Sequence, residues 1–148
     1  MDVSRIRALR GPNLWSRHTA IEAIVSCPPE ECQLSPQHVV EQRLRQIFPG
    51  VGPIEPLRPG QPATMAHALE KVTLALQTQA GCPVTFSRTT ATQETGIYQV
   101  VVQYTEESVG RLAFDLAQQL CQAALQGQPF DVEGAIAQLH ELDEDVRL

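Results

Sequence analysis

The residues whose types and spacing come closest to a catalytic group are His67 and Glu70. Residues three apart on a helix share a face, so this imidazole and this carboxylate can point at one metal ion. A hydrolytic zinc site needs three protein ligands, an open position for water and a general base. The pattern H-x-x-E-H supplies a second histidine, but Lys71 stands in that position and its ammonium repels a dication. Ala75 stands where a carboxylate could follow, so we expect a vestigial His67 and Glu70, no bound metal and no catalytic residue.

A second candidate is the loop over residues 10–17, which reads RGPNLWSR and holds the only tryptophan between two arginines. Arginine offers a planar fork of donors to carboxylates, and indole stacks on guanidinium groups. We interpret this stretch as a recognition loop. The alternative, in which Trp15 is a buried residue of the hydrophobic core, stays open. Together with an arginine that follows the predicted strand at 83–87, the candidate binding residues are Arg10, Asn13, Trp15, Arg17 and Arg88.

The elements that must position these residues follow from hydrophobic periodicity and from turn residues. The predicted strands come in adjacent pairs along the chain, each followed by helices, in the order β-β-α-α-β-β-α-α. This order predicts an α+β fold of antiparallel strands packed with about four helices. We expect one domain over residues 1–148, or two lobes, 1–50 and 62–148, joined by the proline- and glycine-rich loop 49–62. The predicted strands are 3–10, 19–27, 83–87 and 97–104, and the predicted helices are 35–48, 63–80, 106–126 and one that begins at 131.

Helix ends carry their own signals in this sequence. Thr105 and Asp131 are predicted to cap the N-termini of the last two helices. Gly81 and Gly127 are predicted to end the helices before them, because glycine adopts the left-handed backbone that favours a C-terminal cap.

Composition narrows the classes of function. The formal net charge is −6, which argues against nucleic acid as a partner because such proteins carry a basic footprint. No nucleotide-binding glycine motif is present, and no apolar stretch is long enough to span a membrane. Arginines interrupt the start of the chain, so we expect no signal peptide, a cytoplasmic location and four reduced cysteines that form no zinc site.

Several strings then give the chain a family likeness. Residues 7–16, RALRGPNLWS, resemble the opening R-x-L-R-G-P-N-x-W-S of cyanophycin synthetases. Residues 67–77, 80–89, 97–101, 107–111 and 144–148 continue the resemblance to their N-terminal domain almost to the end of the chain.

This resemblance implies a role beside active sites that lie elsewhere. Cyanophycin synthetases use ATP to build a poly-aspartate backbone with an arginine on each side-chain carboxylate. Their ATP-grasp and Mur-ligase-like domains, with ATP and magnesium, are absent from these 148 residues, so no cofactor is expected here. The resemblance implies cyanophycin, the ligase domains of the same protein and further copies in a homo-oligomer as partners.

The resemblance also bears on hydrolysis. In some cyanobacterial members the matching helix reads H-x-x-E-H-x-x-x-E and resembles a metal-dependent peptidase that trims polymer into primers. Lys71 and Ala75 depart from that pattern, which implies a primer-dependent bacterial synthetase whose N-terminal domain holds the polymer without cutting it. Two alternatives stay open: a metallohydrolase that draws ligands such as His18 or Glu94 from distant positions, and a purely architectural domain of the oligomer.

Overall fold

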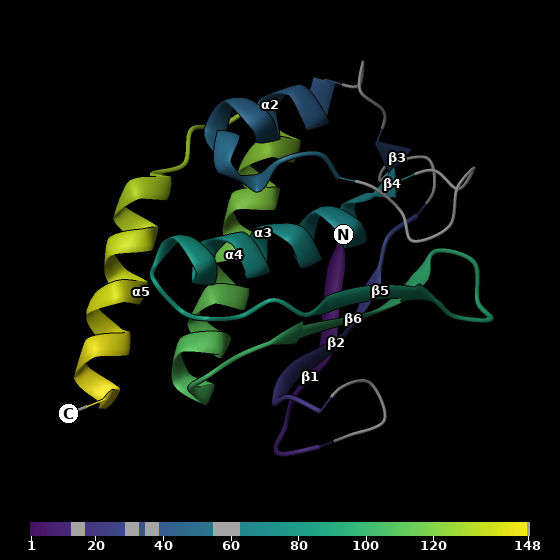
Figure 1. Ribbon diagram of the computed structural model, residues 1–148. Coiled ribbons are helices and arrows are strands. Elements are labelled where there is room, and N and C mark those ends of the chain that lie inside the picture. Colours follow the sequence, from purple (N-terminus) through teal and green to yellow (C-terminus); the bar gives the residue numbers. More distant parts are fainter. Residues whose placement is uncertain (13–16, 29–32, 35–38, 55–62, 148) are drawn as a thin grey trace.

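A four-stranded antiparallel sheet forms the base of the fold. The structure is a computed structural model and describes residues 1–12, 17–28, 33–34, 39–54 and 63–147, apart from the Gln33 side chain. The sheet contains β1 (Asp2–Leu9), β2 (Ala20–Ser26), β6 (Ile97–Gln103) and β5 (Ser87–Ala91), in that spatial order (Figure 1). The predicted α+β class with antiparallel strand pairs is therefore confirmed.

Helices cover one face of this sheet. α3 (Met65–Gln79) packs over β5 and β6, and α4 (Glu107–Gln126) packs beside α3 and over β2. A second layer follows, in which α2 (Val39–Ile47) lies against α4, and α5 (Val132–Arg147) lies against both α3 and α4 (Figure 1). No described helix covers the opposite face of the sheet.

Small elements that the sequence did not predict join the layers. Ala63 and Thr64 were expected to begin a helix, and Pro49–Val51 was expected to be part of a loop. A two-stranded ladder pairs β3 (Gln33–Leu34) with β4 (Ala63–Thr64), and a 3₁₀ turn, η1 (Pro49–Val51), follows α2. Two-residue strands carry no periodicity, so their pairing depends on how the surrounding helices bring the two segments together.

One hydrophobic core lies between the sheet and the helices. Alternate residues of the central strands point into it, and helical residues at a spacing of three and four meet them. Its fully buried members include Ile21, Val25, Val100 and Val102 from the sheet and Leu69, Leu76, Phe114 and Leu120 from α3 and α4.

A β-bulge interrupts β1. Ser4 pairs with Ile24 and Arg7 pairs with Glu22, so two residues of β1 stand opposite the single residue between those partners. Arg5, the first of the two, has a φ of +52°, which is uncommon for a residue other than glycine. Because side chains alternate along a strand, the additional residue reverses the phase and moves Arg7 to the face that Ser4 occupies.

The predicted strand at 83–87 is wrong in position, since β5 begins only at Ser87. The backbone N–H groups of Thr85 and Phe86 donate to the side-chain oxygen of Gln103, at 2.8 and 3.0 Å. That carboxamide replaces the ladder partner that a strand would supply. The paired strand therefore begins at the last residue of the predicted strand and continues to Ala91.

The predicted helix ends have mixed outcomes. Gly127 ends α4 with a φ of +69°, and the Asp131 carboxylate accepts the backbone N–H of Gly134, so both predictions are confirmed. Gly81 follows Ala80, the C-terminal cap residue of α3, with a φ of +96° and is likewise confirmed. The Thr105 prediction is wrong, because α4 begins after Glu106 and no side chain there caps the helix.

The cysteines divide into two kinds. Cys82 and Cys121 are free and buried, as the sequence led us to expect, and burial raises the pKa of the Cys121 thiol to about 12. Cys27 is disulfide-bonded, so the expectation that all four cysteines are reduced is wrong for this residue. No helix among the described residues is long and apolar enough to cross a membrane.

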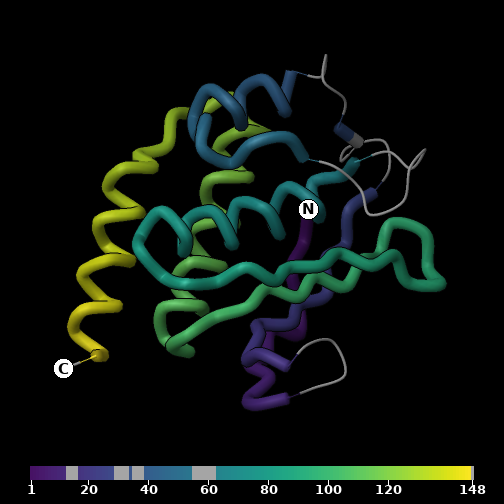
Figure 2. Tube along the Cα trace, viewed as in Figure 1, coloured from purple at the N-terminus to yellow at the C-terminus, as the bar shows by residue number. Residues whose placement is uncertain are grey.

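The chain turns a corner between β6 and α4 (Figure 2). Close to this corner, the structure leaves no room for a side chain at Gly110. A Cβ at that position would lie 2.5 Å from the Cβ of Tyr104. Tyr104 cannot easily withdraw, because its backbone N–H donates to the Thr19 carbonyl at 3.1 Å and its carbonyl accepts the Thr19 hydroxyl at 2.6 Å.

We therefore predict that Gly110→Ala destabilises the fold, although alanine is the better helix former. The expected loss in the free energy of unfolding is about 1–3 kcal/mol, the range for overpacking a tight site. Urea denaturation followed by circular dichroism measures it, with Ser108→Ala, an exposed position in the same helical turn, as the control. Equal midpoints for the two variants would contradict the packing argument.

Candidate functional site

Glu70 is a buried carboxylate between α3 and β5. Glu70 is only 3% exposed, yet both of its carboxylate oxygens accept hydrogen bonds. The Ser87 hydroxyl donates to Oε2, and the Thr89 hydroxyl donates to Oε1 at 2.7 Å. The Lys71 ammonium completes the set, 3.0 Å from Oε2. A buried charge requires this degree of pairing, so Glu70 joins the helix to the edge strand.

His67 faces the same interior, one helical turn earlier. The backbone N–H of Thr64 donates to its Nδ1 at 3.2 Å, and the Thr64 hydroxyl accepts the N–H of Ala66 at 3.2 Å. This is a capping box, in which a histidine replaces the usual glutamate. The ring also meets Tyr98 of β6 edge to face, with centroids 6.1 Å apart. His67 therefore begins α3 and packs it on the sheet.

The described contacts of these two residues are with the fold. Nδ1 of His67 is used by the helix cap, both oxygens of Glu70 are used by hydroxyls and by an ammonium, and Lys71 adds positive charge beside the carboxylate. Across the part of the chain that the structure describes, no three His, Cys, Asp or Glu side chains are grouped to hold a metal. The arrangement supports a structural role for His67 and Glu70.

A second group of polar side chains lies on the face of the sheet that no described helix covers, which we call the open face. Glu22 lies between two core-facing residues of β2 and so points to this open face. Arg7 pairs with it through Nε at 2.7 Å, and the Gln99 carboxamide donates to its other oxygen at 3.0 Å. Strand register extends this pair into one lateral row across all four strands, formed by Arg7, Glu22, Val101 and Arg88.

The arginines divide into those that form an ion pair within the structure and those that do not. Arg7, Arg10, Arg45, Arg111 and Arg147 each pair with a carboxylate. Within the described segments, Arg5, Arg17 and Arg88 are exposed and have no ion-pair partner. An exposed guanidinium without a carboxylate partner keeps its full set of donors for a ligand.

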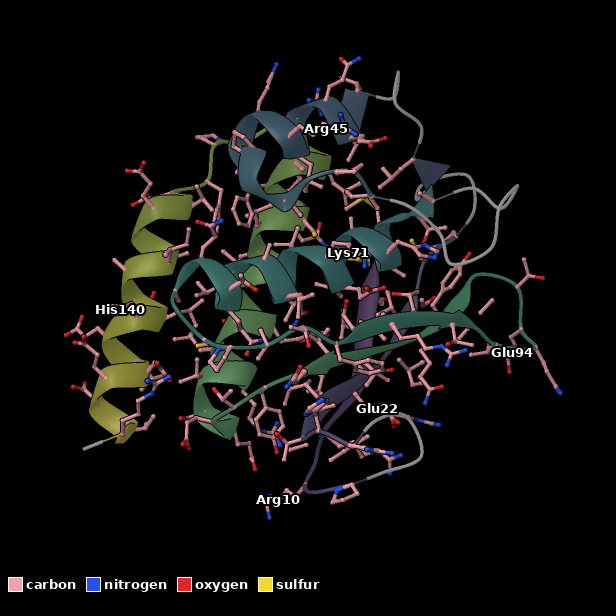
Figure 3. All side chains as sticks on the ribbon, in the orientation of Figure 1. Arg10, Glu22, Arg45, Lys71, Glu94 and His140 are labelled. Atoms are coloured by element: carbon pink, nitrogen blue, oxygen red, sulfur yellow. The ribbon has the colours of Figure 1, made fainter. Side chains whose placement is uncertain are left out.

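The predicted recognition loop is placed only in part. Asn13 and Trp15 lie outside the described residues. Arg10 is bound at the base of the loop, where its guanidinium contacts Glu107 at 2.8 Å. The Arg111 and Arg10 guanidinium groups lower the pKa of Glu107. Figure 3 shows Arg10 and Glu22 on the sheet side of the molecule, away from Arg45 on α2.

Sequence reasoning missed Arg5, Arg7 and Glu22 as members of the open face. The signal that could have found them is a change of phase in β1, where Val3 and Ala8 both face the core although their separation is odd. An odd separation on one face of a strand requires a bulge. The partner strand, and so the row, is fixed only by tertiary pairing.

Comparison with known proteins agrees with the likeness found in the sequence. Residues 40–126 match the family described as the cyanophycin synthase-like N-terminal domain. The chain is similar to cyanophycin synthetases from Trichormus variabilis and from Nostoc sp., each 34% identical over 163 residues that cover 100% of this chain and 18% of the relative. The synthetase from Geminocystis herdmanii is 30% identical over 158 residues, which cover 96% of this chain. The chain thus spans about 18% of the length of these relatives.

The buried position of His67 predicts a dependence of stability on pH. Burial is the main cause that lowers the pKa of this imidazole, while Glu70 acts in the opposite direction. As the pH falls below about 6.5, the unfolded chain takes up a proton at this residue that the folded chain resists. The contribution of His67 to stability is therefore complete above that pH and declines below it.

We expect His67→Gln to reduce the loss of stability between pH 7.5 and pH 5.5, because glutamine can accept the same capping hydrogen bond without titrating. Urea midpoints at the two pH values measure the effect. His140→Gln serves as the control, since the His140 side chain is 57% exposed. A pH dependence identical in H67Q and in the unsubstituted chain would refute the assignment.

Proposed function

Because this chain belongs to the cyanophycin synthase-like N-terminal domain family, we propose that it binds cyanophycin and does not cut it. In the whole protein it would hold the growing polymer for ATP-dependent ligase domains, within a homo-oligomer. The observation that carries the proposal is the exposed guanidinium of Arg88 on this sheet face, which has no ion-pair partner among the described residues and lies in register with the Arg7–Glu22 pair.

The chemistry of the polymer suits that face. Each unit of an aspartate polymer that carries arginine through its side chain exposes one carboxylate and one guanidinium. Arginine side chains bind carboxylates through two parallel hydrogen bonds. Arg5 and Arg88 are exposed and have no ion-pair partner among the described residues, so they can engage the carboxylates of different units at once. Repeated weak contacts along one polymer add to a larger avidity.

The proposal that the domain does not hydrolyse polymer has separate support. The one helix that resembles a hydrolytic site uses His67 to cap itself and Glu70 to bind β5. Lys71 stands 3.0 Å from the carboxylate, where a second metal ligand would be needed. We propose that the ammonium took over the charge-balancing task of a cation at this position, so that the buried carboxylate kept a structural use.

Binding is tested by titrating short synthetic aspartate–arginine oligomers into the chain and measuring the heat. Arg88→Gln should raise the dissociation constant about threefold to tenfold. The reason is that one lost hydrogen bond at an exposed site reduces the binding free energy by about 1 kcal/mol. Arg45→Gln removes the same charge from α2 and should leave affinity unchanged. Absence of binding at millimolar oligomer would favour the architectural alternative.

The absence of hydrolysis is tested by incubating the chain with cyanophycin and zinc and following polymer length. We expect no shortened chains, because Lys71 and Ala75 supply no metal ligands. The double variant Lys71→His with Ala75→Glu gives the matched comparison, since it restores both missing side chains on the same helix. Appreciable cleavage by the unsubstituted chain would overturn the proposal and favour the metallohydrolase.

A further inference from the structure

A hollow of about 560 Å³ lies at the hairpin end of the open sheet face. β1 borders it with Ser4 and Arg5, and the turn between β5 and β6 borders it with Glu94. Ile24 and Ile97, which project to the open face from β2 and β6, supply apolar walls. Figure 3 shows Glu94 at the outer end of that hairpin. The hollow thus combines one cation, one anion and an apolar floor.

Neither charge is used by the fold. Arg5 and Glu94 are both exposed, and the described residues offer no ion-pair partner to either side chain. A small zwitterion could therefore satisfy both without breaking an existing pair.

The backbone holds both residues in place. Arg5 is the first of the two bulge residues and has a φ of +52°. This conformation costs free energy in a residue with a Cβ. On the other side, the Thr92 hydroxyl donates to the carbonyl of Ile97 at 2.9 Å and accepts the N–H of Glu94 at 3.3 Å. The N–H of Ile97 donates to the Glu94 carbonyl at 3.1 Å. A backbone held in this way loses little conformational entropy when a ligand binds.

We propose that this hollow is a subsite for a single zwitterionic arginine unit, with its carboxylate on Arg5 and its guanidinium on Glu94. Its methylene stem lies along Ile24 and Ile97, as the stems of long cationic side chains commonly do on apolar surface. The assignment rests on the proposed function, because the polymer that crosses the open face presents such units. It adds that one unit is recognised at a fixed place, separately from the row that contains Arg88.

The test uses small probes rather than polymer. Nα-acetyl-arginine carries both groups, N-acetyl-agmatine carries the guanidinium without the carboxylate, and Nα-acetyl-norvaline carries the carboxylate without the guanidinium. Each is titrated into ¹⁵N-labelled chain while amide shifts are followed. We expect saturable shifts for Nα-acetyl-arginine at residues 4–6 and 92–97, and at least about fivefold weaker binding for the two single-charge probes, equivalent to one lost charge-assisted hydrogen bond.

Two variants separate binding from folding. Arg5→Gly removes the guanidinium and suits the positive φ, so the fold should keep its stability while the probe loses its binding. Glu94→Gln removes the opposite charge from an exposed turn and should have the same effect on binding. Arg45→Gln on α2 removes a cation outside the hollow and should leave the affinity for the probe unchanged. Unchanged affinity of Nα-acetyl-arginine for R5G or E94Q would overturn the proposal.

The outcomes for the subsite and for the proposed function are distinct. If Nα-acetyl-arginine fails to shift residues 4–6 and 92–97 while oligomers still bind and depend on Arg88, the subsite is refuted and the polymer-binding function stands. If the single unit binds in the hollow but oligomers do not bind, the polymer-binding function is refuted and the subsite stands.

Discussion

The fold depends on one constraint: the described helices cover a single face of the four-stranded sheet, so every strand must divide its side chains between the apolar core and the opposite face. Successive residues of a strand point to opposite faces, which makes that division automatic once register is set. Ile21 and Val25 enter the core, and Glu22 between them is left on the open side. The interior and the charged face are thus two consequences of one periodicity.

Among the strands that the structure describes, only β1 departs from that periodicity, and the departure determines which charged side chains reach the open face. With regular alternation from Ser4, both Arg5 and Arg7 would point toward the helices, where unpaired guanidinium groups are costly to bury. The bulge places Arg7 on Glu22 and leaves Arg5 exposed at the edge. One additional residue in a strand therefore decides the position of two cations.

Charge inside the molecule follows a different rule from charge on the open face. Glu70 is buried, and the structure surrounds it with two hydroxyls and an ammonium so that no oxygen lacks a donor. Arg88 is exposed on a strand and has no carboxylate partner among the described residues. The residues that looked catalytic in the sequence are thus the ones most committed to the fold. Those left uncommitted lie on the open face.

The sequence by itself determined the class of fold, most helix and strand positions, the family, and the incomplete metal pattern at Lys71. These features are local: hydrophobic period, turn residues such as Gly127 and Asp131, and strings of identical residues. Tertiary structure alone decided that β5 begins at Ser87, because the distant Gln103 side chain binds the backbone before it. It also decided that Glu70 meets β5 and that Arg7, Glu22 and Arg88 share one row, since strand order and register join residues that are far apart in the chain.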